Sequence, residues 1–318
     1  MQSPGRAIGA FALSGRTLDW VSGPINAENV PTLLLERNLG SSRTRILARS
    51  VDPTGGLVST QRWVAYVGPP TRTLFAVSHD GTHRHVLARN LLAAIAGRGG
   101  RVAWAQQDGD RQRIYSSSLA TGERRLIADL PRCVGTHCYR IDFLTLADHG
   151  VVFTRGAIGP QPSFVYRRAY GRPLEHIALA GDPQPDLAPS SAGALYNYYA
   201  HGWYRWDLGR SRPQLTRIRG FTTEEPLAYE HGAWYLLTRN GCRSTVERSY
   251  GMGRAVPEIT AAEVARLTHT AATTCVALGS FSIVGRREVS AWILQPGKEI
   301  DEHVDTGLVG VIASTPAP

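Results

Sequence analysis

The fold is decided by residues 101–129, which read RVAWAQQDGDRQRIYSSSLATGERRLIAD. An apolar strand containing Trp104 leads into an Asp-Gly turn, and the next strand carries Ile114 and Tyr115. A Thr-Gly turn then precedes a third strand, which begins with two arginines. Apolar stretches of this length bounded by glycine turns are typical of antiparallel hairpins. The segment therefore predicts three consecutive strands of one sheet.

The same frame recurs seven times along the chain, with a period of about 44 residues. In each copy a turn is followed by a strand with one large apolar residue at a fixed place. These residues are Trp20, Tyr66, Trp104, Phe153, Tyr196, Tyr235 and Ile283. One more strand precedes each turn, so each repeat supplies four short strands, the pattern of a propeller blade. We therefore expect an all-β fold, a seven-bladed β-propeller with four-stranded antiparallel blades.

No linker interrupts the repeats, so we expect one domain over residues 1–318. The blades fall at roughly 6–50, 51–90, 91–130, 139–181, 186–220, 225–260 and 274–313. In the last blade, strands are expected at GSFSI (279–283), SAWILQP (290–296) and KEIDEHV (298–304). GLVGVIA (307–313) is then left to pair with the first blade or to follow the edge of the last.

Residues 101–129 resemble the TolB-type propeller repeat, and TLFAVSHDGTHRHVLARN (73–90) matches its later half. The other five copies share only the hydrophobic frame. The resemblance implies an extracytoplasmic protein that binds other proteins or envelope polymers through one face or its channel. It carries over no individual binding residue, because the repeat motif is structural.

The four cysteines predict two local disulfides. Cys133 and Cys138 lie in one loop, whereas Cys242 lies in a turn of the sixth repeat and Cys275 opens the seventh. Both pairs fall where a propeller brings its loops to one face, and an even count favours an oxidising compartment. Reduced thiols, or a metal site formed by Cys133, His137 and Cys138, are the alternatives.

The chain begins without a recognisable signal peptide and has no apolar segment of membrane-spanning length. Together with the predicted disulfides, this suggests a secreted or cell-envelope protein whose targeting segment is absent from this sequence. The net charge is +9, and arginines recur on the expected fourth strands, where a charged rim is the ordinary outcome. With no basic run and no RNA-binding motif, nucleic acid is not expected as a partner.

Insertions mark one face as the binding face. The longer loops are 22–31, 129–138, 181–190 and about 258–274, and the last holds a short helix near 260–269 that Thr260 can cap. A cluster of aromatic residues in the fifth repeat places Tyr199, His201 and Trp203 at this face. Such rings suit sugars and peptide side chains alike. The leading hypothesis is a non-catalytic binding or scaffold propeller that recognises a protein segment or a glycan there.

The rival hypothesis is a hydrolase or lyase that acts on a polysaccharide or a small metabolite. Its candidate catalytic residues are Glu224, Glu225, Asp182, His201 and Arg155. Paired carboxylates would have to converge within about 10 Å to cleave a glycosidic bond, and converging carboxylates would also bind Ca²⁺. No nucleophile elbow, phosphate loop or dinucleotide motif is present, so no cofactor is expected. The sequence does not determine the oligomeric state.

Overall fold

We describe the fold from a computed structural model. It describes residues 2–4, 7–23, 32–41, 43–132, 139–157, 163–179, 187–189, 193–198, 202–208, 214–215, 225–250, 255–271, 274–284, 287–296 and 309–316. Most of these residues lie in strands, and they contain one short helix. The chain divides into two compact units, Met1–Thr54 with Ile218–Pro318, and Gly55–Arg217. The expected all-β fold of four-stranded antiparallel sheets is confirmed.

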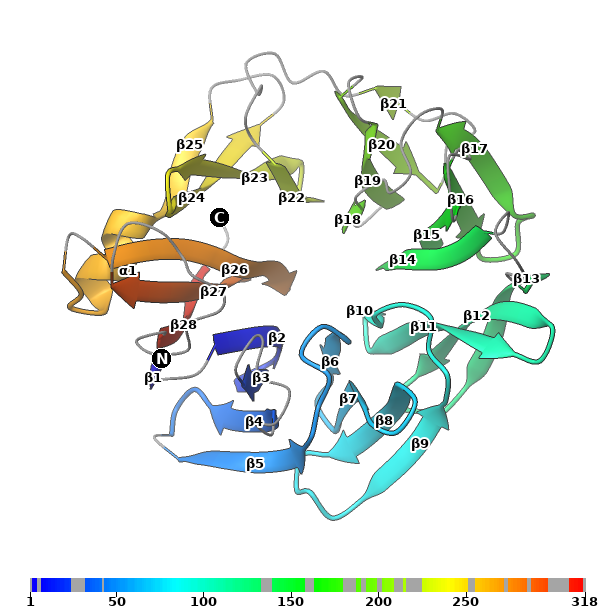
Figure 1. Ribbon diagram of the computed structural model, residues 1–318, viewed down its shortest axis with the longest axis horizontal. Coiled ribbons are helices and arrows are strands. Elements are labelled where there is room, and N and C mark those ends of the chain that lie inside the picture. Colours follow the sequence, from blue (N-terminus) through cyan, green and yellow to red (C-terminus); the bar gives the residue numbers. More distant parts are fainter. Residues whose placement is uncertain are drawn as a thin grey trace. The chain divides into compact units, whose positions relative to one another are not determined.

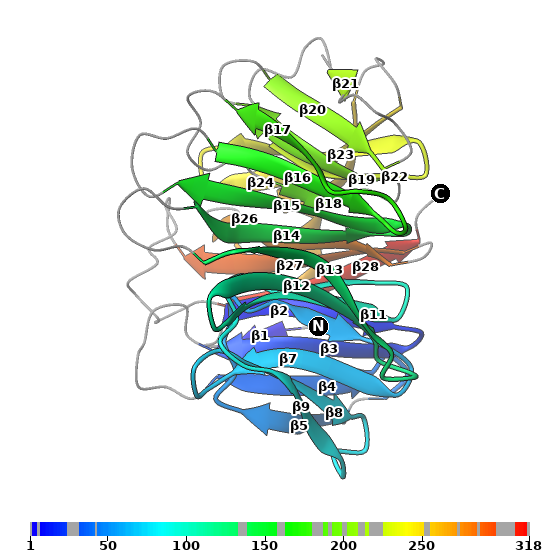
Figure 2. The ribbon, with the colours of Figure 1, turned by 90° about the vertical axis from the view of Figure 1, so that its right-hand side faces the viewer.

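The unit of residues 55–217 contains sheets of four antiparallel strands in chain order. One comprises β6 (Leu57–Ser59), β7 (Trp63–Gly68), β8 (Thr73–Ser78) and β9 (Arg84–Ala88). The next comprises β10 (Ala96–Arg98), β11 (Arg101–Asp108), β12 (Arg111–Ser118) and β13 (Arg124–Pro131). Figure 2 shows its successor, with β14 (Tyr139–Ala147), β15 (Gly150–Ala157), β16 (Ser163–Ala169) and β17 (Glu175–Leu179) side by side. A further sheet comprises β18 (Leu187–Pro189), β19 (Gly193–Tyr198), β20 (Gly202–Asp207) and β21 (Gln214–Leu215).

The other unit contains strands from both ends of the chain. One sheet comprises β2 (Ala7–Ser14), β3 (Thr17–Gly23), β4 (Leu33–Asn38) and β5 (Thr44–Arg49). A larger sheet joins two groups of four through a single parallel bridge between Arg243 and Val276. The first group is β22 (Glu225–Glu230), β23 (Ala233–Asn240), β24 (Arg243–Tyr250) and β25 (Val256–Thr260). The second is β26 (Thr274–Val284), β27 (Arg287–Pro296), β28 (Val309–Pro316) and β1 (Gln2–Pro4).

The second of these groups corrects the strand assignment of the last repeat. Residues 279–283 belong to its first strand rather than its second, because Gly279 lies at a β-bulge in β26 and not in a turn. The second strand is β27, and its buried aromatic residue is Trp292 rather than Ile283. GLVGVIA falls largely within β28, which pairs with β27, and the fourth strand comes from the N-terminus as β1 (Figure 1). KEIDEHV lies outside the described residues.

Buried aromatic residues form the centre of the second strands. Trp20, Tyr66, Trp104, Phe153, Tyr235 and Trp292 are all almost completely buried. In the unit of residues 55–217, three of them begin columns of stacked side chains that cross the sheet. Tyr66 stacks on Phe75, Trp104 on Tyr115, and Phe153 on Tyr166. The large aromatic residues that recur on the second strands are therefore core-packing residues.

A cationic side chain on the fourth strand completes two of these columns. The guanidinium carbon of Arg84 lies 3.8 Å from the ring centre of Phe75, and that of Arg124 lies 3.6 Å from that of Tyr115. The arginines of the rim are thus not simply solvated, since these two rest on aromatic faces. The sequence predicted their position but not their contacts.

The predicted helix near 260–269 is confirmed as α1 (Ala261–Leu267). The hydroxyl of Thr260 accepts a hydrogen bond from the backbone N–H of Glu263 at 3.1 Å, as its place before the helix predicted. Ala261, Val264 and Ala265 bury the inner side of the helix against the core that contains Tyr235 and Trp292.

Candidate binding site

Most of the predicted site residues lie outside the described part of the chain. Asp182, Tyr199, His201 and Glu224 belong to this group. Two others are described only in their backbone: Glu225 opens β22 opposite Leu237, and Trp203 pairs with Asn197 in β20. Convergence of the carboxylates, and the aromatic platform, therefore stay predictions.

Arg155 is the candidate catalytic residue whose side chain is described. It lies near the end of β15, it is almost completely buried, and its Nη2 donates to the carbonyl oxygen of Tyr139 at 3.1 Å. A second, longer bond of 3.4 Å reaches the carbonyl oxygen of Pro131. Within the described residues, both acceptors are backbone atoms, so these contacts hold the chain in position and are not those of an acid or a base.

Gln112, which the sequence analysis did not single out, holds the same two carbonyl groups. Its amide nitrogen donates to Pro131 at 2.9 Å and to Tyr139 at 2.8 Å, and its oxygen accepts the N–H of Ile141 at 3.1 Å. Pro131 and Tyr139 lie on either side of residues 132–138, so Gln112 and Arg155 together hold the chain before and after that segment. We call these two side chains the loop clamp.

The sequence does contain a signal for Gln112. In β12, alternate residues face the same way, and Gln112, Ile114 and Ser116 are fully buried. A glutamine at a position that alternation assigns to the core must satisfy both ends of its amide there. The pattern could therefore have identified a structural hydrogen-bonding residue, although not its partners.

The region beside the loop clamp is rich in aromatic and charged groups. The guanidinium carbon of Arg155 lies 5.8 Å from the ring centre of Tyr139 and 6.0 Å from that of Tyr166. The carboxylate of Asp142 accepts the backbone N–H of Gly156 at 3.0 Å. Burial raises the pKa of Asp142, while the hydrogen bond from Gly156 and the charge of Arg140 act in the opposite direction. These groups can bind a ligand through ring faces and hydrogen bonds at the base of a loop.

In the other unit, a disulfide fixes the end of a hairpin to the first strand of the next group. Cys242 lies between β23 and β24, and Cys275 lies in β26, with 5.3 Å between their Cα atoms. The predicted Cys242–Cys275 disulfide is confirmed. It lies beside the bridge from Arg243 to Val276, so the end of one hairpin is again fixed to the first strand of the next group. Cys133 and Cys138 lie outside the described residues, and their pairing stays a prediction.

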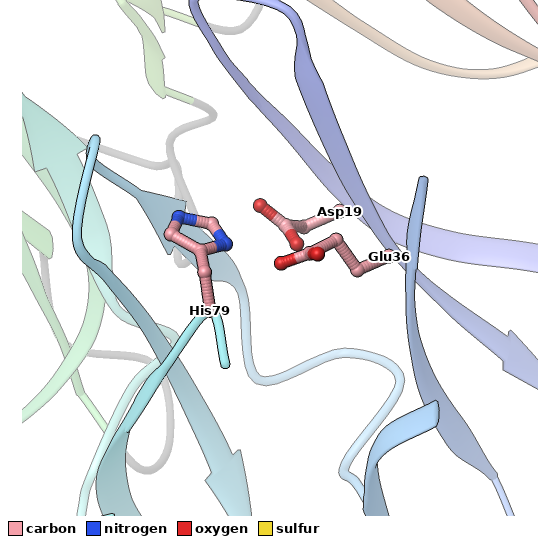
Figure 3. A group of neighbouring side chains, drawn as sticks. All are labelled: Asp19, Glu36 and His79. Carbon is pink, nitrogen blue, oxygen red and sulfur yellow. The ribbon is translucent and has the colours of Figure 1, made fainter. Parts of the chain in front are cut away.

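Two buried carboxylates face each other in the sheet of β2 to β5. Asp19 on β3 pairs in register with Glu36 on β4, and their oxygens lie within 4.8 Å (Figure 3). Arg45 on β5 lies 2.6 Å from Glu36 and neutralises part of the charge. His79, also drawn in Figure 3, belongs to the unit of residues 55–217, where its Nε2 lies 2.7 Å from the carbonyl oxygen of Thr60. One sheet thus carries a row of three charged side chains across its strands, Asp19, Glu36 and Arg45.

A second buried charged group lies near α1. Tyr235 interacts electrostatically with Glu288 and Arg248, and Arg248 lies 3.3 Å from Glu258. Burial raises the pKa of Tyr235, and the carboxylate of Glu288 raises it further. The network crosses from β23 and β24 to β27 and therefore connects the two groups that the disulfide also joins. In the described part of the chain, no helix is long and apolar enough to cross a membrane.

Comparison with solved structures identifies the fold. The chain is similar to the β-propeller domain of the trilobed protease from Pyrococcus furiosus, with a TM-score of 0.60, 9% identity and 98% of each chain covered. It is also similar to a prolyl endopeptidase, with a TM-score of 0.61, 13% identity, and 91% of this chain and 45% of the other covered. The present chain therefore spans less than half the length of that enzyme. These likenesses show a β-propeller fold and nothing about activity.

TolB from Acinetobacter baumannii also matches, with a TM-score of 0.43 and 14% identity over 91% of this chain and 77% of the other. A TM-score of 0.43 is too low to bear on the type of repeat. No family model matches the sequence. No curated protein matches it either.

Proposed function

We propose that this chain is an extracytoplasmic, non-catalytic binding propeller that holds a protein segment or a glycan on the loop ends of its sheets. By loop ends we mean the ends where the second and third strands join and where the chain passes to the next sheet. The loop clamp carries the proposal, because it commits two buried polar side chains, Gln112 and Arg155, to fixing one such loop.

Fixed loop ends favour binding because less conformational entropy is lost when a ligand orders them. Ties of this kind recur at other sheets. Arg72 donates to the carbonyl oxygen of Leu92 at 3.4 Å, and Thr32 donates to that of Val51. Cys242 and Cys275 provide a covalent tie. A scaffold whose loop ends are held by a disulfide and by hydrogen bonds is suited to presenting those loops to a partner.

The disulfide also supports an extracytoplasmic location. Disulfides between neighbouring structural groups persist in oxidising compartments and are rare where thiols are kept reduced. The bond between Cys242 and Cys275 joins strands of two such groups. A secreted or envelope-associated binding protein would keep this bond throughout its working life.

The test is a thermal-shift panel of common sugars, cell-wall fragments and a peptide library, followed by calorimetry on each compound that raises Tm. A ligand that binds the folded state raises Tm by mass action. We expect a hit whose affinity falls about tenfold in Gln112→Ala, because the loop between Pro131 and Tyr139 loses its fixed ends. Thr121→Ala is the control, since Thr121 lies in the turn between β12 and β13, at the opposite end of the sheet, where its hydroxyl accepts the N–H of Glu123 at 3.3 Å.

Two results would overturn the proposal. Turnover of any hit, detected by product analysis, would establish the enzyme hypothesis instead. A ligand whose affinity is equally unaffected by Gln112→Ala and Thr121→Ala would place binding away from this loop.

A further inference from the structure

Two arginines of the outer strands differ from their neighbours in having no carboxylate partner among the described residues. Two nearby arginines form ion pairs: Arg125 on β13 lies 2.7 Å from Glu123, and Arg111 on β12 lies 2.7 Å from Asp129. Arg84 on β9 and Arg124 on β13 instead lie on the rings of Phe75 and Tyr115. Both arginine side chains are exposed.

Stacking prepares these guanidinium groups to bind an anion. A planar guanidinium that rests on a ring keeps its N–H edges directed outward, and it loses little freedom when those edges engage a carboxylate. The ring beneath also fixes the position of the charge, since Tyr115 is itself stacked on the buried Trp104. Arg84 is supported in the same way through Phe75 and Tyr66.

Each of these arginines has an exposed apolar residue two positions further along its strand. Val86 on β9 is 48% exposed, and Leu126 on β13 is 53% exposed. Residues two apart in a strand share one side. The two outer strands therefore present the same pair, a stacked cation beside a large apolar side chain, at corresponding places of successive sheets.

The backbone edges of these strands are also available. β9 and β13 are the last strands of their sheets, and no described strand pairs with their outer edges. An extended peptide can add to such an edge through main-chain hydrogen bonds, with side chains giving specificity. A sugar polymer or a nucleic acid has carboxylates or phosphates but cannot continue the ladder and cover Val86 or Leu126.

We propose that the outer edges of β9 and β13 bind an extended acidic segment of a partner protein, in which a carboxylate and a large apolar residue stand two positions apart and so share one side of the added strand. The carboxylates pair with Arg84 or Arg124, the apolar side chains cover Val86 or Leu126, and the backbone extends the sheet. This surface is separate from the loop ends, and it stands or falls independently of the function proposed for them.

The probe is a labelled peptide of repeated Glu-Ser-Val-Ser, which places glutamate and valine on one side of an extended strand, and its affinity is measured by fluorescence polarisation with the whole chain. We expect the double variant Arg84→Gln/Arg124→Gln to bind it at least about tenfold more weakly. Arg125→Gln removes the same kind of charge from the same strand, but its guanidinium is already paired with Glu123. This control variant should bind the probe as the wild type does.

Three further measurements separate strand addition from simple charge attraction. Leu126→Ser should weaken binding of the probe. A probe with N-methylated glutamates should not bind, because it lacks the backbone N–H groups that would extend the sheet. Heparin and a polyglutamate peptide should bind more weakly and without dependence on Leu126. Melting curves of each variant establish that the sheets remain folded.

The proposal is overturned if the wild type does not bind the probe, or if Arg125→Gln weakens binding as much as the double variant. It is equally overturned if heparin or polyglutamate binds as tightly as the Glu-Ser-Val-Ser peptide.

Discussion

Gln112 shows how much one buried side chain contributes to the arrangement of this chain. It satisfies the carbonyl oxygens of Pro131 and Tyr139 and the N–H of Ile141. Removal of its amide deprives the buried N–H of Ile141 of its acceptor and leaves the two partly buried carbonyl groups with Arg155 alone, and each lost or unsatisfied bond costs free energy. We expect Gln112→Ala to lower the free energy of unfolding by about 3 kcal/mol, measured by urea denaturation.

Gln107→Ala is the control for stability. Gln107 donates to carbonyl groups of its own turn, where water can replace it. Its loss should cost about 1 kcal/mol or less. Equal losses in the two variants would contradict the role assigned to Gln112.

Asp142 gives a prediction about pH. Burial raises the pKa of its carboxyl in the folded protein above the ordinary value of 3.8, so the folded state binds the proton more tightly than the unfolded chain. This group therefore stabilises the fold most below the ordinary pKa, and the contribution is lost as pH rises through the folded pKa. We expect Asp142→Asn, which keeps an oxygen for Gly156, to have the higher Tm at neutral pH and no advantage in acid.

Asp129→Asn is the control, because it should change Tm at neutral pH in the opposite direction. Its hydrogen bond from Arg111 holds the pKa of Asp129 below the usual value, so its stabilising contribution is present at neutral pH and is lost as pH falls. The variant should therefore have the lower Tm at neutral pH. Tm measured against pH for both variants decides the matter, and two curves shifted in the same direction would exclude this account.

Individual residues of the site were only partly predictable from the sequence. Arg155 was selected because it was expected just past a strand at the loop face, whereas the structure places it inside β15, near its end. Its partners were not predictable, because Pro131 and Tyr139 contribute backbone oxygens that any residue carries. Side-chain identity can suggest a polar centre, but its contacts depend on how two successive sheets pack.

At the scale of strands and sheets, the disulfide is the strongest local constraint. Cys242 and Cys275 are separated by 33 positions in the sequence. Closing a loop of that size in the unfolded chain accounts for roughly 3–4 kcal/mol of stability in the chain-entropy model. We expect Cys242→Ala/Cys275→Ala to lose about this amount in denaturant unfolding under oxidising conditions.

Reducing agent provides the internal control for that measurement. The wild type should lose stability when dithiothreitol is added, whereas the double variant should lose clearly less. If the wild type and the double variant unfold at the same denaturant concentration without reductant, the bond does not stabilise these two groups.

The short strand β1 gives a prediction about the ends of the chain. Gln2, Ser3 and Pro4 pair with Val311, Gly310 and Val309 and complete the group that β26 begins. Deletion of residues 1–4 removes this outer strand. We expect a lower Tm and faster amide exchange at residues 309–311 than in the wild type, measured by hydrogen–deuterium exchange.

Residues 317–318 offer a deletion of similar kind at the other end. That deletion should leave the exchange of residues 309–311 unchanged. Unchanged exchange after removal of residues 1–4 would instead mean that β1 contributes nothing to the group.

Elements were predictable from the sequence wherever a glycine marked a turn. The hairpin at Gly109 and the helix capped by Thr260 lie where the pattern indicated. The last repeat failed because Gly279 produces a bulge in a strand of 11 residues, and a bulge and a turn have the same local signal. The role of β1 could not be read from any repeat, since its partner strand lies at the opposite end of the chain.

At the scale of the whole molecule, the repeat predicted the class of fold and the charge predicted little. The net charge of +9 suggested a rim of solvated arginines. The structure separates that rim into ion-paired arginines, such as Arg125, and stacked ones, such as Arg124. A charge total cannot distinguish these two situations, because the distinction depends on which residues lie across the strand.

The compartment in which the protein works is tested by the state of its cysteines. If both predicted pairs are closed, unreduced protein unfolded in denaturant should bind no alkylating agent, and reduced protein should gain four labels in intact-mass analysis. The structure shows the bond between Cys242 and Cys275, so Cys133 and Cys138 decide the result. Peptide mapping assigns the labels, and the Cys242→Ala/Cys275→Ala variant, which retains only the other pair, serves as control. Two labels on Cys133 and Cys138 before reduction would contradict the second disulfide and weaken the case for an oxidising compartment.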